Sequence, residues 1–298
     1  MSGKLHLVAT PIGNLGDISE RTKQTLHEAD FIAAEDTRVT RNLLQHLNIK
    51  KELISYHEHN RRSSGEKIIA RIIAGETCAL VTDAGTPGIS DPGEDLARQC
   101  IDANIEVYAI PGPCAAVAAL TISGLPAGRF AFEGFLSMAK KSRFEHLNAL
   151  KDEERTMIFY EAPHKLTRTL ADMLEVLGDR RISISRELTK MHEETMRTRL
   201  STAIEHYAQT TPRGEYVLVI EGAPHSSKRE EYDEAAMAEA VAATIANIKN
   251  GLSLKDAVKI TAPERGIPKN ALYSAVLKHD VTKTEDREST SILRQSDN

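Results

Sequence analysis

Residues 81–93 read VTDAGTPGISDPG, a turn rich in glycine and proline between an apolar run at Thr77–Thr82 and a helical pattern at Glu94–Asn104. A buried strand that enters a tight loop and then a helix is the repeating unit of α/β folds. Two further apolar runs end in similar loops, Leu5–Thr10 before PIGN at 11–14 and Ile105–Ile110 before PGPC at 111–114. The pattern predicts an α/β protein.

The alternation of strands, loops and helices predicts where the domains begin and end. Strands predicted at Phe31–Glu35 and Leu53–His57 complete an N-terminal α/β domain over residues 1–123. Strands predicted at Met157–Tyr160, Ile182–Ser185 and Tyr216–Ile220 indicate a second α/β domain over residues 124–225.

The remaining sequence changes in character after residue 225. Alanine-rich helical patterns predict a small helical module over residues 226–280, with helices at Asp233–Asn250, from Ser253 onward and at Lys269–Lys278. Ser253 with Asp256 three residues later is typical of a helix N-terminus. Residues 281–298 are polar and charged, and we expect them to be disordered.

Composition sets broad limits on function. The chain has 298 residues, of which 41% are hydrophobic, and no apolar run reaches the length of a membrane-spanning helix. The apolar stretch at the N-terminus is too short and too polar for a signal peptide, so we expect a cytoplasmic protein. The three cysteines are far apart in sequence, and we expect their thiols to be reduced. A formal net charge of -5 means that any nucleic acid would be held by local basic patches.

The three glycine- and proline-bearing loops predict a ligand site. Loops at residues 10–14, 83–93 and 111–115 follow strands, and ligands of open α/β sheets bind beyond the carboxyl ends of strands, so we expect them to converge on one crevice. Glycine lets main-chain groups approach a ligand, which suits an adenosine and an amino acid. The sequence contains neither phosphate-binding pattern, GxxxxGK[ST] or GxGxxG after a strand. Asp83 with Asp91 could be metal ligands, but capping of loops and helices is the favoured interpretation, and we predict no metal.

Several segments, in order, resemble the tetrapyrrole methylases, and in particular the branch of that family that modifies small-subunit rRNA. These segments are ATPIGNLGDIS (9–19), AEDTR (34–38), SYHEHN (55–60), VTDAGTPGISDPG (81–93), IPGP (110–113), FYEAPHKL (159–166), SRELTKMHEE (185–194) and GEYVLVIEG (214–222). The helical stretch at 253–277 is similar to the C-terminal extension of that branch. Two positions depart from the pattern: Cys114 stands where serine is usual, and Ser137–Lys141 lacks a proline.

The resemblance implies a two-domain class III fold that binds S-adenosylmethionine, usually as a homodimer. For this branch it implies methylation of a ribose 2′-oxygen of a cytidine in the decoding region of small-subunit rRNA. The cofactor contacts that the resemblance and the loop positions imply are Pro11, Ala84, Gly85, Thr86, Pro87, Ile89, Cys114, Ala115, Glu161 and Gly222.

Methylation of a ribose hydroxyl is helped by a base at a strand end that faces the crevice. The catalytic candidates are Glu35, Asp36 and Glu187. Glu35 and Asp36 are adjacent carboxylates that can raise each other's pKa, whereas Asp36 could equally be the N-cap of the next helix. Because side chains alternate along a strand, His57 and His59 would lie on the same side of it. For this pair, hydrogen bonding or phosphate contact is favoured over metal binding.

Basic and polar side chains near the crevice are candidates for binding RNA. They are Arg38, His57, Arg61, Arg62, Lys140, Lys141, Arg143, Arg186 and Lys190. Runs of charge are often only solvated surface, so each cluster needs a structural test.

Two other functions fit parts of the sequence. An enzyme of the same fold could methylate a tetrapyrrole or another small precursor, although only 4% of the residues are aromatic and there is no tryptophan to stack on a porphyrin. Alternatively, the C-terminal helices could bind nucleic acid like a helix-turn-helix while the α/β part senses S-adenosylmethionine.

Overall fold

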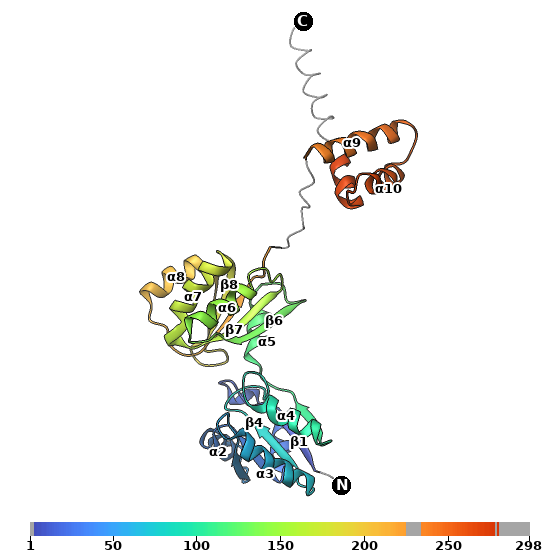
Figure 1. Ribbon diagram of the computed structural model, residues 1–298. Coiled ribbons are helices and arrows are strands. Elements are labelled where there is room, and N and C mark those ends of the chain that lie inside the picture. The colour runs from blue at the N-terminus through green and yellow to red at the C-terminus, as the bar shows by residue number, and fades with distance from the viewer. Residues whose placement is uncertain (1–2, 225–233, 278, 280–298) are drawn as a thin grey trace. The chain divides into compact units, whose positions relative to one another are not determined.

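The computed structural model describes residues 3–224, 234–277 and 279, and the chain forms two compact units, Met1–Pro224 and His225–Asn298. The larger unit contains two five-stranded sheets (Figure 1). The predicted α/β class is therefore confirmed for this unit.

The first sheet is parallel, with strand order β3-β2-β4-β1-β5. Its strands are β1 (Lys4–Val8), β2 (Phe31–Ala34), β3 (Glu52–Ser55), β4 (Cys78–Val81) and β5 (Glu106–Ile110). The helices between them are α1 (Glu20–Glu28), α2 (Thr37–His46), α3 (Arg61–Ile73) and α4 (Gly93–Asp102), with a short 3-10 helix at Leu15–Asp17. All five carboxyl ends lie along one edge, which is where the predicted loops begin.

Both faces of the first sheet are covered, because alternate strand residues point to opposite sides. Phe31 and Leu80 pack with α3 and α4 on one face, where Ile68 and Leu96 are fully buried. Ile32 and its alternating neighbours pack with α1 and α2 on the other face. The core therefore holds the strand ends in a fixed arrangement.

The second sheet is mixed, with strand order β6-β7-β10-β8-β9. Its strands are β6 (Phe130–Phe135), β7 (Thr156–Glu161), β8 (Arg181–Arg186), β9 (Glu194–Arg199) and β10 (Tyr216–Ile220). The central strand β10 runs antiparallel to both β7 and β8. The helices are α5 (Ala115–Ile122), α6 (Lys140–Ala149), α7 (Pro163–Leu177) and α8 (Leu200–Gln209).

The helix α5 follows the first sheet in the chain but packs on the second. Ala116, Ala119 and Leu120 of α5 form one apolar cluster with Val217 and Val219 of β10. The helices α6, α7 and α8 cover the opposite face of the second sheet. The expected domain boundary at residue 123 falls at the end of α5, and the division into two α/β domains remains a prediction.

The smaller unit is helical. It contains α9 (Glu234–Lys249), α10 (Leu254–Glu264) and a further helix at 269–277, which share an apolar core that includes Val258, Leu272 and Val276. Ser253 is the N-cap of α10 and accepts a hydrogen bond from the Asp256 amide, as the sequence predicts. The predicted ends at Asp233 and Lys278 and the predicted tail at 281–298 lie outside the described residues.

Among the helices that the structure describes, none combines the length and the apolar character needed to cross a bilayer.

Candidate active site

Hydrogen bonds tie the three predicted loops together at the carboxyl edge of the first sheet. The main-chain groups of Thr10 and Gly85 exchange two hydrogen bonds of 2.9 and 3.1 Å. The hydroxyl of Thr86 donates to the carbonyl oxygen of Pro113 at 2.9 Å. Gly85 has a φ of 86°, a conformation that favours glycine. The predicted convergence of these loops is confirmed.

Asp91 organises the longest of these loops. Its carboxylate accepts hydrogen bonds from the amides of Gly88, Ile89 and Gly93, with distances of 2.7 to 3.2 Å. Gly93 is the first residue of α4, so Asp91 caps both the loop and the helix start, as the sequence analysis favoured.

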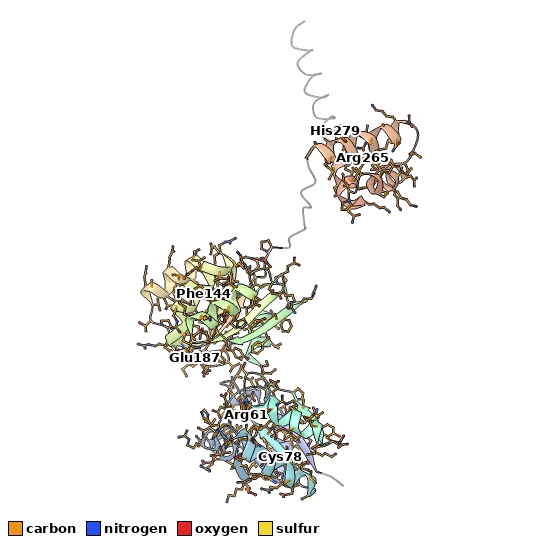
Figure 2. All side chains as sticks on the ribbon, in the orientation of Figure 1. Arg61, Cys78, Phe144, Glu187, Arg265 and His279 are labelled. Carbon is orange, nitrogen blue, oxygen red and sulfur yellow. The ribbon has the colours of Figure 1, made fainter. Side chains whose placement is uncertain are left out.

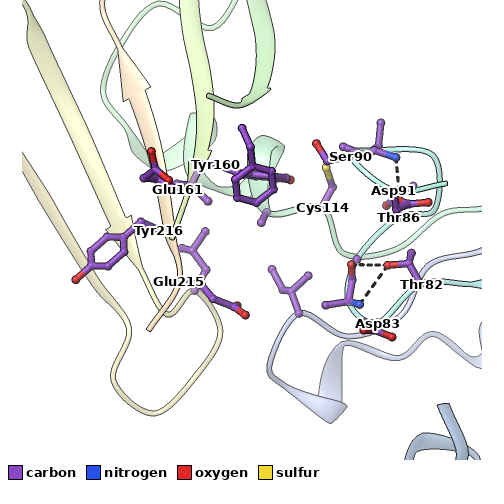
Figure 3. A pocket seen from close by; sticks show the side chains of 18 of the residues that line it. Thr82, Asp83, Thr86, Ser90, Asp91, Cys114, Tyr160, Glu161, Glu215 and Tyr216 are labelled. Atoms are coloured by element: carbon purple, nitrogen blue, oxygen red, sulfur yellow. Dashed lines mark hydrogen bonds between the residues drawn. The ribbon is translucent and has the colours of Figure 1, made fainter. Parts of the chain in front are cut away.

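A cleft of about 600 Å³ lies between the loops of the first sheet and one end of the second sheet (Figure 3). This volume is in the range of small-molecule sites. The first sheet and its loops contribute Ile12, Glu35, Thr82, Asp83, Ala84, Gly85, Thr86, Ile89, Ser90, Asp91, Cys114 and Ala115. The second sheet and its loops contribute Phe135, Tyr160, Glu161, Ala162, Pro163, Ser185, Leu188, Glu215, Tyr216 and Val217.

The cleft is acidic. Five carboxylates line it, and no lysine, arginine or histidine does so among the residues that the structure describes. Glu161 and Glu215 are paired with Lys165 and Lys190, and Asp91 accepts hydrogen bonds from loop amides, so among the described residues Glu35 and Asp83 are the lining carboxylates that remain to attract a cation. The cleft therefore fits a small ligand that carries positive charge and hydrogen-bonding edges.

Glu35 and Asp36, the adjacent catalytic candidates, have opposite environments. Glu35 lines the cleft, and its pKa is raised by burial and by the nearby charges of Asp83 and Asp91. Asp36 is the N-cap of α2, and hydrogen bonds from Arg38 lower its pKa to about 2. The prediction that the two carboxylates raise each other's pKa is wrong, because Asp36 is neutralised by Arg38 and Glu35 faces Asp83 instead.

Two other acidic candidates have their oxygens occupied. Glu161 is almost fully buried and accepts hydrogen bonds from the Ala162 amide at 2.8 Å and the Thr169 hydroxyl at 2.6 Å, with Lys165 at 2.9 Å. Glu187 lies outside the cleft lining, at the end of the second sheet that faces the first (Figure 2), where a hydrogen bond from Lys190 lowers its pKa. The partner of Glu187 therefore favours the charged form of that carboxylate.

The direction of β10 places one predicted contact at the wrong end of the sheet. Tyr216, the first residue of β10, pairs with Glu161 at the cleft, so Gly222 beyond the far end lies against the main chain of Glu154 and Arg155. The prediction that Gly222 contacts a cofactor is therefore wrong. Pro11 and Pro87 also lie outside the cleft lining, and their neighbours Ile12 and Thr86 are the residues that face it.

The basic candidates divide by exposure. Arg61, Arg62, Lys140 and Lys141 are exposed, and Arg62 and Lys141 form only long ion pairs of 3.7 and 3.9 Å. Arg38 is exposed but makes a two-pronged contact with Asp36. Lys190 contacts both Glu187 and Glu215, and Arg186 lies 3.8 Å from Glu194. His57 is half-buried beyond the end of β3, so the alternation expected for His57 and His59 along a strand is wrong.

Arg143 contradicts its assignment to an RNA-binding patch. It is 2% exposed, its Nε donates to Asp172 at 2.6 Å, and its Nη1 donates to the carbonyl oxygens of Ser137 and Met138 at 2.9 Å. The guanidinium holds the loop after β6 from inside and is not available to phosphate. Its place on the inner face of α6, a helix that the sequence analysis did not identify, explains the error.

Sequence reasoning missed the aromatic part of the site. Tyr160 lines the cleft, and its hydroxyl accepts a hydrogen bond from the Ala116 amide at 3.1 Å, while burial raises its pKa to about 12. Phe135 also lines the cleft, with its ring 5.5 Å from that of Tyr160. Tyr160 lies in the segment FYEAPHKL at the end of a predicted strand, and this position could have identified it as a cleft residue. No such sequence signal exists for Phe135, because β6 is not predicted.

Known proteins resemble the chain in sequence and in fold. Residues 4–204 match the family of Tetrapyrrole (Corrin/Porphyrin) Methylases. The chain is 48% identical to ribosomal RNA small subunit methyltransferase I of Synechocystis, over 93% of this chain and 98% of that protein. It is 44% identical to the protein of the same name from Bacillus subtilis, over 92% and 94% of the two chains.

Solved structures support the same assignment at the level of fold. A Thermus thermophilus uroporphyrin-III C-methyl transferase complexed with S-adenyl homocysteine superposes with a TM-score of 0.54 at 17% identity, covering 74% of this chain and 97% of that chain. A diphthine synthase superposes with a TM-score of 0.56 at 12% identity, over 74% and 90% of the two chains. From the match over residues 4–204 and the shared fold, the chain belongs to the tetrapyrrole methylase family.

Proposed function

We propose that this protein uses S-adenosylmethionine to methylate a ribose 2′-oxygen of a cytidine in the decoding region of small-subunit rRNA. The acidic cleft between the two sheets carries the proposal, because it suits a sulfonium cofactor and repels phosphate-bearing ones. The names of relatives that are 42–48% identical over more than 90% of this chain support rRNA as the substrate.

The cleft has the features that this cofactor requires. Main-chain groups at Ala84–Thr86 and at Cys114–Ala115 can read an adenosine and an amino acid, and Ile89 with Leu188 provides apolar contact. Asp83 and Glu35 complement a positive charge. When bound, S-adenosylmethionine supplies a methyl group activated by the sulfonium.

Glu35 is the base that the geometry favours among the three catalytic candidates. It lines the cleft, and its carboxylate accepts a hydrogen bond from the Asp83 amide at 3.3 Å, which leaves other oxygen lone pairs free. Burial raises its pKa and so increases its affinity for a proton. Glu35 would accept the proton of the ribose hydroxyl, whereas Asp36 and Glu187 are occupied by Arg38 and Lys190.

The RNA backbone remains at the rim, because the cleft itself is acidic. Exposed cations at two places can hold phosphates, Arg61 with Arg62 at the start of α3 and Lys140 with Lys141 at the start of α6. We also propose a cytoplasmic location, which an rRNA substrate would require. By resemblance to its family we propose a homodimer, which sedimentation of the purified protein would test.

A labelling experiment separates this function from its alternatives. The purified protein is incubated with methyl-labelled S-adenosylmethionine and with small subunits from cells that lack the gene, protein-free rRNA, or a tetrapyrrole precursor. Label in a ribose of a decoding-region cytidine supports the proposal. Label only in the tetrapyrrole contradicts it in favour of a small-molecule methyltransferase, and cofactor binding without any transfer favours a sensing role.

Replacing Lys140 and Lys141 by alanine is expected to weaken RNA binding and to reduce its salt dependence. Each lost phosphate contact should lower the slope of log K against log salt concentration by about 1. The measurement is filter binding of small-subunit rRNA between low and high salt. Lys4→Ala is the matched control, because Lys4 starts β1 at the opposite edge of the sheet and pairs with Glu106. An unchanged slope in the double variant would show that these lysines are only solvated surface.

A further inference from the structure

Phe135 is an exposed aromatic ring in an unusual local conformation at the rim of the cleft. It ends β6, where the pairing with β7 shifts register between Phe132 and Gly134. Gly134 has a φ of 63°, in the left-handed region, and an added Cβ would lie 3.4 Å from the Ser90 hydroxyl. Such a bulge re-aims the side chains that follow it. The ring of Phe135 is thereby turned into the cleft lining while the residue stays 53% exposed.

Neighbouring aromatic and basic side chains pack against the ring of Phe135. Tyr160 lies 5.5 Å away in a tilted arrangement, and Phe132 packs edge-on against Tyr160 at 5.0 Å. The ammonium of Lys165 lies 5.4 Å from the centroid of Phe135 and is itself fixed by Glu161. A supported aromatic ring that remains open to solvent is pre-organised for a flat partner, because little side-chain freedom is lost on binding.

Two exposed cations flank the loop that follows Phe135. Lys140 begins α6, and its ammonium lies over the ring of Phe144. Arg168 on α7 contacts the thioether of Met138 at 3.8 Å. Within residues 3–224, neither Lys140 nor Arg168 forms an ion pair in the structure. Sequence analysis did not single out Arg168, although it lies two residues beyond the family-like segment at 159–166.

Phe135 therefore lies where the acidic cleft meets a basic rim. A nucleotide that presents its ribose to the cleft must keep its phosphates among cations and place its base nearby. Proteins that read single-stranded RNA stack unpaired bases on aromatic rings and hold the backbone with basic side chains.

We propose that Phe135 stacks on the base of the nucleotide that is methylated, with Lys140 and Arg168 binding its flanking phosphates. This inference rests on the proposed function and names the residues that position the substrate. Stacking fixes the base, and through the glycosidic bond it fixes the ribose whose hydroxyl must lie close to the reacting methyl group.

Kinetics with small subunits test the proposal. Phe135→Ala is expected to lower kcat/KM for subunits about ten- to a hundredfold, the range found for loss of one base-stacking ring, and Phe135→Tyr should restore most of it. Affinity for S-adenosylmethionine, measured by calorimetry, should change less than twofold. Phe130→Ala is the matched control, since Phe130 is also exposed on β6 but pairs with Thr156 at the opposite end of the sheet.

Tryptophan fluorescence gives a second readout, because the chain has no tryptophan of its own. In Phe135→Trp, protein-free small-subunit rRNA should quench the emission and S-adenosylmethionine alone should not, while Phe130→Trp should respond to neither.

Three outcomes would overturn the proposal. If Phe135→Ala weakens cofactor binding as much as it lowers kcat/KM, the ring contacts the cofactor rather than the RNA. If kcat/KM is unchanged, the ring is an ordinary surface residue. If the unmodified protein binds S-adenosylmethionine but methylates no RNA, the proposed function itself has failed, and that result is separate from the first two.

Discussion

Replacing Glu35 by glutamine is expected to lower kcat for RNA methylation by about a hundredfold or more, the usual contribution of a general base. Glutamine has nearly the same shape but cannot take the proton of the ribose hydroxyl. The measurement is the initial rate of label transfer to small subunits at saturating cofactor. The affinity of Glu35→Gln for S-adenosylmethionine is measured separately, because a weaker affinity would mean that Glu35 acts by attracting the charged cofactor and not as a base.

The pH profile should identify the same carboxylate. As the proposed base, Glu35 would act in its deprotonated form, so the rate should rise with pH and level off above a pKa that is higher than that of an ordinary glutamate. Asp83→Asn should move this limb to lower pH, because the charge of Asp83 helps to raise the pKa of Glu35. Glu35→Gln should lack the limb.

Stability should change in the opposite direction to activity. A carboxyl group whose pKa is raised in the folded protein opposes folding once it is ionised, so its favourable contribution is lost as the pH rises through the folded pKa. Glu35→Gln should therefore increase the free energy of unfolding at neutral pH, and the difference should vanish in acid. For the activity measurement, Asp36→Asn is the control, since it disturbs the helix cap and the Arg38 contact but should retain most of the methylation rate. Equal losses of kcat in Glu35→Gln and Asp36→Asn would exclude Glu35 as the base.

Replacing Arg143 by methionine is expected to lower the free energy of unfolding by about 3–5 kcal/mol, because it leaves the carboxylate of Asp172 buried without its partner. For a unit of this size, such a loss lowers the melting temperature by roughly 10 °C. The carbonyl groups of Ser137 and Met138 lose their donor as well, so the loop after Phe135 should loosen. Urea unfolding followed by circular dichroism provides the measurement.

A double-mutant cycle shows whether the buried pair is the cause. Arg143→Met with Asp172→Leu removes both charges and should recover a large part of the stability. Lys141→Met is the surface control on the same helix, since its side chain is 89% exposed, and it should change stability by less than about 0.5 kcal/mol. A loss below 1 kcal/mol in Arg143→Met would mean that water reaches Asp172 and that the pair is not structurally important.

The sequence predicts the first sheet well because its strands are parallel and the central strands β2 and β4 are buried on both faces. Apolar runs such as Cys78–Val81 end in loops whose glycines and prolines are visible without a structure, and parallel strands place all those loops at one edge. The convergence of residues near Thr10, Gly85 and Pro113 could therefore be predicted.

The second sheet is harder to predict for two physical reasons. An apolar run such as Tyr216–Ile220 looks the same whether its strand runs parallel or antiparallel. The sequence therefore predicts Gly222 at the cleft, whereas the structure has Glu215–Val217 there. The edge strand Glu194–Arg199 has no buried face and carries five charged or polar residues among its six, and β6 is interrupted by a bulge. Neither strand shows the alternation or apolar run by which strands are identified.

The helix α5 belongs to the first half by chain order and to the second half by packing, which has a bearing on how the protein could be divided. A fragment ending at Ser123 would contain an apolar helix without the sheet on which it packs, and Val217 and Val219 in the remaining fragment would be exposed. A division within Pro111–Pro113 would instead keep α5 with the second sheet, on which it packs.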